Sequence, residues 1–267
     1  MPEPGEEKLS DLFSLKGRSA LVTGGSRGIG RMIAAGFIAQ GARVYISSRK
    51  AEACEKTARE LSAGGGTCVP IPMDASSVEG ARALAAAVTA REPKLDILVN
   101  NAGAAWLATF DEFPEKGWDK VLDLNLKTPF FLTQALHRAL GAAASAERPA
   151  KVINIVSIDG IAANPQETYS YQASKAGLIH LTRRLALHLI RDNIVVSAIA
   201  PGAFASDINI QARDHAQATA QRIPARRIGH DDDMAAAAIY LASRAGDYVV
   251  GHTLVVDGGV NFAHAWP

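Results

Sequence analysis

The sequence predicts a Rossmann-like α/β fold, in which one domain forms a doubly wound parallel sheet of seven strands with helices on both faces. Seven short runs rich in β-branched residues alternate with longer helical stretches, the pattern of right-handed βαβ units. Most of these runs are apolar throughout, as strands covered by helices on both sides are. The 267 residues, 48% of them hydrophobic, suffice for one sizeable core, and no linker divides them.

The first half of the chain supplies four strands and three helices. We expect strands at 19–24, 43–47, 68–72 and 96–100, and helices at 28–40, 51–63 and 77–91. The first run, SALVTG, leads directly into a glycine-rich turn and the first helix. The next two runs are again followed by helical stretches, so strand and helix alternate up to residue 100.

The second half continues the alternation with one interruption. We expect strands at 151–156, 194–200 and 252–257, and helices at 118–144, 171–191 and 231–243. The last helix follows HDDDM at 230–234, whose carboxylates suit a helix N-terminus better than a cation site. Residues 203–228 are irregular and rich in Gln, Ala and Arg. A long insert beside a strand end is often a substrate lid, which we expect here.

Composition narrows the classes of function. We expect an N-terminal extension at 1–14 and one domain at 15–267. The 28 basic and 27 acidic residues nearly cancel, which argues against nucleic acid or a membrane as a partner. The acidic, polar N-terminus does not resemble a secretory signal, and Cys54 and Cys68 suit reduced thiols in a cytoplasmic protein. No His or Cys spacing suits a metal, so none is expected.

The stretch TGGSRGIG predicts a dinucleotide-binding loop between the first strand and the first helix. Its glycines are spaced G-x-x-x-G-x-G, which differs from the common G-x-G-x-x-G pattern. Glycines let the backbone turn sharply and approach a pyrophosphate, which the helix N-terminus attracts. A tight strand-to-helix turn without a ligand is the plainer alternative. The loop residues expected at the cofactor are Gly24, Ser26, Arg27, Gly28, Ile29 and Gly30.

The end of the second strand predicts NADP(H) rather than NAD(H). An NAD site usually places Asp or Glu here, to accept hydrogen bonds from the ribose 2′-hydroxyl. This chain has Ser48 and Arg49 instead, and a guanidinium pairs with the 2′-phosphate that a carboxylate repels. Arg27 lies in the glycine loop and can reach the same phosphate. The alternative is that Arg49 is a solvated charge at a strand end.

Five ordered motifs resemble the short-chain dehydrogenase/reductase family. They are TGGSRGIG, NNAG at 100–103, Asn125, the pair formed by Ser157 and YQASK at 171–175, and PG at 201–202. The match runs from about residue 15 to residue 260, in the branch that resembles the 3-oxoacyl-(acyl carrier protein) reductases. The resemblance implies that the two long helices and the C-terminal GHTLVVDGG join subunits. A homotetramer is therefore expected, with a dimer as the alternative.

Helix geometry distinguishes the two tyrosines of ETYSYQASKAG. Tyr171 and Lys175 are four residues apart and share one helical face, so the ammonium can sit near the phenol. A nearby cation favours phenolate, and we expect it, together with the positive charge of an oxidised nicotinamide, to move the Tyr171 pKa toward neutrality. Tyr169 lies six residues before Lys175 and falls off that face. We therefore predict Tyr171 as the acid/base and Tyr169 as a packing or substrate-wall residue.

Two more residues complete the expected catalytic set. Ser157 ends its strand at the carboxyl edge of the sheet, where its hydroxyl can donate to a substrate carbonyl. Fourteen residues separate it from Tyr171, one more than is common in the family, which implies an extra residue in the intervening loop. By resemblance, Asn125 supports a water-linked proton path to Lys175. Its alternative is an asparagine that bonds to backbone within a helix.

The resemblance also implies further contacts to the cofactor. Asp74 matches the residue that accepts from the adenine amino group, although a carboxylate near a helix start is a serious rival explanation. Lys175 is expected to bond the nicotinamide ribose. The remaining expected cofactor residues are Ala75, Asn101, Gly103, Tyr171, Pro201, Gly202 and Ser206, the last standing where the family often has threonine.

Together these features predict an NADPH-dependent carbonyl reductase. The expected substrate is a ketone, most of all a 3-oxoacyl thioester on coenzyme A or acyl carrier protein. The first alternative is a dehydrogenase of a sugar, polyol or steroid-like secondary alcohol, which the segment at 203–228 would select. An alternative of another class is a dinucleotide-sensing scaffold without activity. The complete Asn, Ser, Tyr and Lys set argues against the scaffold, because a sensor needs no acid/base pair.

Overall fold

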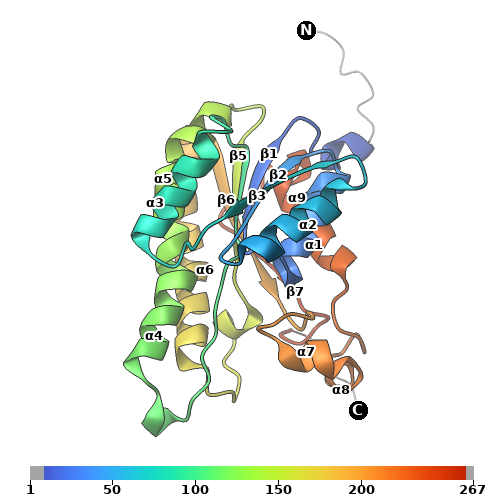
Figure 1. The fold of residues 1–267 in the computed structure, drawn as a ribbon. Helices are drawn as coiled ribbons and strands as arrows, with labels where there is room; N and C mark the ends of the chain where they lie inside the picture. The colour runs from blue at the N-terminus through green and yellow to red at the C-terminus, as the bar shows by residue number, and fades with distance from the viewer. Residues whose placement is uncertain (1–8, 263–267) are drawn as a thin grey trace.

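A computed structural model describes residues 9–262 of the chain as one Rossmann-like domain (Figure 1). Its core is a parallel sheet of seven strands in the order β3-β2-β1-β4-β5-β6-β7. The strands are β1 Ser19–Thr23, β2 Arg43–Ser48, β3 Thr67–Pro72, β4 Ile97–Asn100, β5 Ala150–Ile155, β6 Ile194–Pro201 and β7 Thr253–Val256. The predicted fold class is confirmed, and all seven predicted strands are present within a residue or two of their expected bounds.

Helices cover both faces of the sheet, as the apolar strands require. One face carries α1 Gly28–Ala39, α2 Ala51–Ser62 and α9 Asp231–Ala242, and the other carries α3 Val78–Thr89, α5 Thr128–Ala143 and α6 Tyr169–Leu189 (Figure 1). Every residue of β1, β4, β5 and β6 is buried. The strand order reverses between β1 and β4, which is where ligands bind in open α/β sheets.

The predicted helix at 118–144 is present but is not α-helical throughout. It consists of α4 Glu115–Leu122, a π-helical segment Asp123–Lys127, and α5. A π turn holds one residue more than an α turn, and such turns are frequent at functional sites. The π-helical segment was not predicted, because apolar periodicity does not reveal a local change in the hydrogen-bond ladder.

The segment at 203–228 is mostly irregular, as expected, and contains two short helices, α7 Ile210–Asp214 and α8 Ala216–Ala220. They lie together beyond one end of the sheet (Figure 1). Of the expected N-terminal extension at 1–14, residues 1–8 lie outside the described residues, and Leu9–Phe13 forms a 3₁₀ helix.

The opposite end of the sheet is held by buried charges. Lys151 at the start of β5 is 1% exposed and lies 2.7 Å from a carboxylate oxygen of Asp247. Arg18 is also buried and donates to the Pro149 carbonyl at 3.0 Å.

Cys54 and Cys68 are buried free thiols in the α2 and β3 region, and burial raises the pKa of Cys68 to about 12. Across residues 9–262, no helix combines the length and apolar character that a membrane span needs.

Candidate active site

The glycine loop after β1 leaves an open helix N-terminus. Gly24 and Gly28 have φ of +65° and +50°, a left-handed conformation that favours glycine. Helix α1 begins at Gly28, and the preceding Arg27 makes no side-chain cap. The first N–H groups of α1 are therefore free to donate to an anion, which the helix dipole also attracts.

Gly30 and Asn101 close the loop tightly against the end of β4. A Cβ on Gly30 would lie 2.4 Å from the Gly24 carbonyl oxygen and 2.5 Å from Asn101 Nδ2. Asn101 Nδ2 donates to the Thr23 carbonyl at 2.8 Å, and its backbone N–H donates to Thr23 Oγ1 at 2.9 Å. The predicted Asn101 thus braces the loop rather than extending from it. A cradle that excludes a methyl group beside an open helix N-terminus fits a dinucleotide pyrophosphate.

Ser48 and Arg49 follow β2 at the same edge of the sheet. The loop reaches this strand through a hydrogen bond of 3.2 Å from the Gly25 N–H to the Ser47 carbonyl. Ser48 Oγ donates to the Lys50 carbonyl at 3.2 Å, and the Arg49 side chain is exposed. Neither residue is acidic, so this donor set fits a phosphorylated ribose better than a free 2′-hydroxyl.

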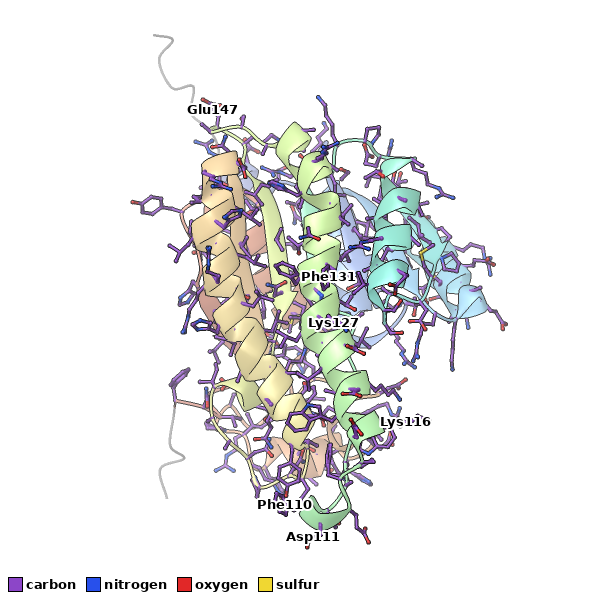
Figure 2. All side chains as sticks on the ribbon, turned by 90° about the vertical axis from the view of Figure 1, so that its left-hand side faces the viewer. Phe110, Asp111, Lys116, Lys127, Phe131 and Glu147 are labelled. Carbon is purple, nitrogen blue, oxygen red and sulfur yellow. The ribbon has the colours of Figure 1, made fainter. Side chains whose placement is uncertain are left out.

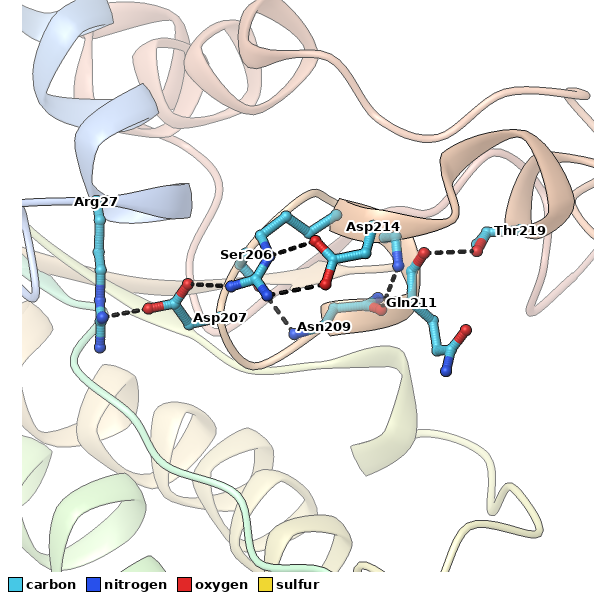
Figure 3. A network of polar contacts seen from close by, with 9 residues as sticks. Arg27, Ser206, Asp207, Asn209, Gln211, Asp214 and Thr219 are labelled. Carbon is cyan, nitrogen blue, oxygen red and sulfur yellow. Dashed lines mark hydrogen bonds and ion pairs between the residues drawn. The ribbon is translucent and has the colours of Figure 1, made fainter.

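Arg27 contacts the segment at 203–228 rather than the end of β2. Its guanidinium pairs with Asp207, which also accepts from Arg213 at 2.7 Å, and Arg213 pairs with Asp214 (Figure 3). Ser206 lies beside this network and accepts from the Asn209 N–H at 3.1 Å. A Cβ on Gly28 would approach Ser206 Cβ to 3.2 Å, so the predicted Ser206 packs directly on the glycine loop.

Asn125 lies in the π-helical segment and is 1% exposed. Its side chain does not bond within its own helix. Oδ1 accepts from the Ala104 N–H at 2.8 Å, while Nδ2 donates to the Ala104 carbonyl at 2.9 Å and to Ser174 Oγ at 3.0 Å. A Cβ on Gly103 would meet both Asn125 Oδ1 and Lys175 Nζ within 3.8 Å. The structure therefore brings Asn125, Gly103 and Lys175 together.

Ser157, Tyr171 and Lys175 converge where β5 meets α6. Ser157 follows β5, is buried, and interacts with the Tyr171 hydroxyl. Lys175 is 4% exposed, and its Nζ donates to the Ile155 carbonyl at 2.8 Å. The same Nζ lies 5.6 Å from the centroid of the Tyr171 ring. The predicted i, i+4 pair of Tyr171 and Lys175 thus lies on one face of α6, and Lys175 on that face contacts the end of β5.

Burial outweighs any effect of Lys175 on the Tyr171 pKa, and a shift toward neutrality with an oxidised nicotinamide stays a prediction. Burial raises the pKa of Tyr171 to about 12, outweighing the Ser157 interaction that lowers it. Burial also lowers the pKa of Lys175 to about 8. The ammonium donates to the Ile155 carbonyl and lies over the Tyr171 ring. Desolvation therefore dominates both groups.

Tyr169 takes the packing role that the geometry predicted. Helix α6 begins at this residue, and its ring makes edge-to-face contacts with Phe110 and Phe113 at 5.8 and 5.6 Å. Its hydroxyl donates to Glu167 at 3.3 Å. These contacts draw the loop before α4 over the start of α6, and Figure 2 shows Phe110 at the end of the molecule opposite Glu147.

The other predicted cofactor residues line the same edge. Asp74 is exposed, and its Oδ1 accepts from the Ser76 N–H at 3.0 Å, whereas Ser77 caps α3. One oxygen of the Asp74 carboxylate is therefore engaged by backbone just before α3, as the rival explanation predicted, while the N-cap itself is Ser77. Pro201 ends β6, and Ile29 packs against the core. Thr128 Oγ1 donates to the Ala75 carbonyl and Thr57 Oγ1 donates to the Ser26 carbonyl. The Gly202 N–H donates to the Val256 carbonyl.

Sequence reasoning missed several residues that support this site. Ser174 accepts from Asn125 and donates to the Tyr171 carbonyl at 2.7 Å, so it ties the π-helical segment to α6. Asp159, Asn164 and Gln172 form a polar chain across the loop between β5 and α6. Asp159 carried a signal, since it stands two residues after Ser157. Among the described residues, no cluster of three or more His, Cys, Asp or Glu side chains is arranged to hold a metal ion.

A parallel sheet that presents a glycine cradle at one edge, with Ser157 and Lys175 buried and Tyr171 partly buried beside it, is typical of a nicotinamide-dependent oxidoreductase. A family model described as Enoyl-(Acyl carrier protein) reductase matches residues 24–261. The chain belongs to the short-chain dehydrogenase/reductase family, as the motifs predicted, and it is an oxidoreductase rather than a scaffold.

Relatives of two kinds resemble the whole chain. The rhamnolipids biosynthesis 3-oxoacyl-[acyl-carrier-protein] reductase of Pseudomonas aeruginosa is 49% identical over 250 residues, 92% of this chain and 97% of the relative. A solved structure described as the Pseudomonas aeruginosa RhlG/NADP active-site complex aligns with a TM-score of 0.91 at 48% identity, covering 94% of this chain and 99% of that one. The 5-keto-D-gluconate 5-reductase of Escherichia coli K12 is 36% identical over 256 residues, 94% of this chain and 98% of the relative.

Proposed function

We propose that the protein is an NADPH-dependent reductase of 3-oxoacyl thioesters. The observation that carries the proposal is the convergence of Ser157, Tyr171 and Lys175 at the carboxyl edge, beside a glycine cradle that fits a pyrophosphate. When bound there, NADPH supplies the hydride that reduces the carbonyl carbon of the substrate. Everything else in the reaction is positioning and proton transfer by this chain.

The proton chemistry follows from the two shifted groups. A phenol whose pKa is raised to about 12 is protonated at neutral pH, so Tyr171 is ready to donate a proton to the carbonyl oxygen during reduction. Ser157 donates a hydrogen bond to the same oxygen and stabilises its developing negative charge. Lys175 orients the nicotinamide ribose, and Asn125, within reach of Lys175, supports the path that returns a proton to Tyr171.

Cofactor selection rests on the end of β2. We infer that Arg49 and Ser48 hold the 2′-phosphate of NADPH, because neither residue repels it and the guanidinium pairs with it. The relative solved in complex with NADP supports this choice. Gly24, Ser26, Gly28, Ile29 and Gly30 would hold the pyrophosphate, Asp74 and Ala75 the adenine, and Asn101, Gly103, Pro201, Gly202 and Ser206 the nicotinamide half.

The substrate class rests on similarity and on an apolar rim. The rhamnolipid reductase is the more similar of the two kinds of relative, at 49% against 36% identity. Leu107 and Phe110, before α4, are 71% and 74% exposed, and Ile208 and Ile210, at 203–228, are 48% and 52% exposed. Exposed apolar side chains in these two segments suit an acyl chain better than a polyhydroxylated acid. The gluconate-type reductase remains the second candidate, because a relative carries that name.

Three further features belong to the proposal. The segment at 203–228 acts as a lid over the substrate, since its Ser206 packs on the glycine loop and its Asp207 holds Arg27. The protein assembles as a homotetramer or a dimer. Exposed apolar residues such as Leu187 on α6 and Tyr248 before β7, at 77% and 100%, suit surfaces that a second copy covers. We place the protein in the cytoplasm, where NADPH and acyl thioesters are available.

Tyr171→Phe tests the function, with Tyr169→Phe as a matched control in the same helix turn. Initial rates are measured with 3-oxoacyl thioesters and with 5-keto-D-gluconate, each with NADPH and with NADH. We expect Tyr171→Phe to lose more than about a hundredfold in kcat while its NADPH affinity, measured by fluorescence, is retained. Tyr169→Phe should stay within a few-fold of the wild type. Full turnover by Tyr171→Phe would refute the assigned acid, and a wild type that reduces only the sugar acid would refute the substrate class.

A further inference from the structure

An acidic residue, Asp159, stands two positions after Ser157 in the turn that packs against α6. Asp159 lies in the 3₁₀ turn Ile158–Gly160 that follows β5, and its N–H donates to Ser157 Oγ at 3.1 Å. The turn is pressed against α6, because a Cβ on Gly160 would lie 2.6 Å from the backbone of Lys175. Asp159 therefore shares a short, closely packed stretch of backbone with Ser157 and faces the helix that carries Tyr171.

Neutral amides fix the position of this carboxylate. Asn164 Nδ2 donates to Asp159 Oδ1 at 2.6 Å, and the Asn164 N–H donates to Gln172 Oε1 at 3.4 Å. Gln172 follows Tyr171 on α6, and its Nε2 also donates to the Gln166 carbonyl at 3.0 Å. Hydrogen bonds thus link Asp159, Asn164 and Gln172 across the loop between β5 and α6, in which the sequence predicted one extra residue.

The charge of Asp159 is not neutralised by an ion pair. Its side-chain partner is the amide of Asn164, and within residues 9–262 no lysine, arginine or histidine forms a salt bridge with it. Burial is the largest cause of the shifted pKa values of Tyr171 and Lys175, and among charged groups Asp159 acts on both, raising the pKa of each. Its field therefore reaches the atoms where the substrate carbonyl must bind.

We propose that Asp159 is a specificity-determining residue that selects ketones without a negative charge near the reacting carbonyl. A 3-oxoacyl thioester or ester carries no charge beside its ketone, whereas a free oxo acid places a carboxylate there. Like charges at one partly buried site repel, so the free acid binds more weakly. The inference rests on the proposed function and deepens it, because it separates 3-oxoacyl thioesters from the corresponding free 3-oxo acids.

Asp159→Asn tests this inference without disturbing the hydrogen bond, because asparagine keeps the Oδ1 acceptor for Asn164. Methyl 3-oxooctanoate and 3-oxooctanoate form a pair with the same acyl chain that differs in charge and by one methyl group. The ratio of their kcat/KM values, ester over acid, is measured with NADPH. If the acid is turned over too slowly, its competitive inhibition constant against the ester is used instead. We expect the ratio to fall by about tenfold in Asp159→Asn, with ester turnover within a few-fold of the wild type.

Salt and a remote variant separate electrostatics from structure. In the wild type the ester preference should weaken as ionic strength rises, and in Asp159→Asn it should depend little on salt. Glu147→Gln removes a charge at the far end of the molecule from Phe110 and should leave the ratio unchanged (Figure 2). An active Asp159→Asn with the wild-type ratio, or an equal loss on both compounds, would overturn the inference alone. A wild type that reduces neither the ester nor a 3-oxoacyl thioester would overturn the proposed function itself.

Discussion

The buried Lys175 should destabilise the fold at neutral pH, and replacing it with methionine should relieve that cost. The ammonium is 4% exposed, and its protein hydrogen-bond partner among the described residues is the Ile155 carbonyl at 2.8 Å. Methionine is unbranched and similar in length, so Lys175→Met fills the same space without a charge. The variant should be inactive as a reductase yet folded.

The size of the effect follows from the pKa of Lys175. Folding lowers it from 10.5 to about 8, and each pH unit between the two values is worth about 1.4 kcal/mol. The penalty, about 3 kcal/mol, is fully present below pH 8, where both states bind the proton. Between about pH 8 and pH 10.5 the unfolded chain holds the proton and the folded protein does not, so stability rises with pH. The lost hydrogen bond costs the variant about 1 to 3 kcal/mol at every pH.

The assay compares the free energies of unfolding of the wild type and Lys175→Met, without cofactor and at one fixed protein concentration. Urea curves are recorded at several values from neutral pH to about pH 10, below the range in which the Tyr171 phenol ionises in the folded state. The variant's stability relative to the wild type should decline by about 2 to 3 kcal/mol over this range. A difference that stays constant with pH would refute the argument that burial destabilises the ammonium.

Three further outcomes are expected. Gly30→Ala should weaken NADPH binding at least tenfold in a fluorescence titration, because the added Cβ would lie 2.4 Å from a carbonyl oxygen of the same loop. Gly141→Ala is the control: a Cβ there meets nothing within 4 Å, so this variant should bind NADPH as the wild type does. Asp207→Asn removes the ion pair with Arg27, so a protease should cut the chain near residue 207 faster than in the wild type. The NADPH affinity should rise no more than about fivefold, because an ion pair between exposed side chains contributes little free energy. Asn125→Ala removes one buried and two partly buried hydrogen bonds and should lower the free energy of unfolding by about 2 to 4 kcal/mol in urea; an unchanged midpoint would contradict that.

The sheet could be predicted from the sequence because a strand buried on both faces must be apolar along its whole length. Such runs as ALVT and VINI leave few other interpretations, and the alternation with helices then fixes the parallel topology. The i, i+4 spacing of Tyr171 and Lys175 was equally decisive, since helix geometry alone places both side chains on one face. These features depend on local periodicity, which a single sequence displays directly.

What the sequence did not reveal depends on contacts between distant segments. The π-helical turn at 123–127 is held by bonds from Asn125 to Ala104 and Ser174, residues about 20 and 50 positions away. The pKa values of Tyr171 and Lys175 follow from burial, which spacing does not report. Arg27 was expected at a phosphate, and its pairing with Asp207 across 180 positions has no local signal.

The π-helical segment between α4 and α5 makes the number of residues in this stretch important for the site. Each residue of an α-helix advances the side chains by about 100° around the axis. Deleting one residue from 123–127 would therefore rotate Asn125 away from its partners or turn the apolar face of α5 away from the sheet. Sequence changes that preserve every side chain but alter the count by one would be as damaging here as the loss of the asparagine itself.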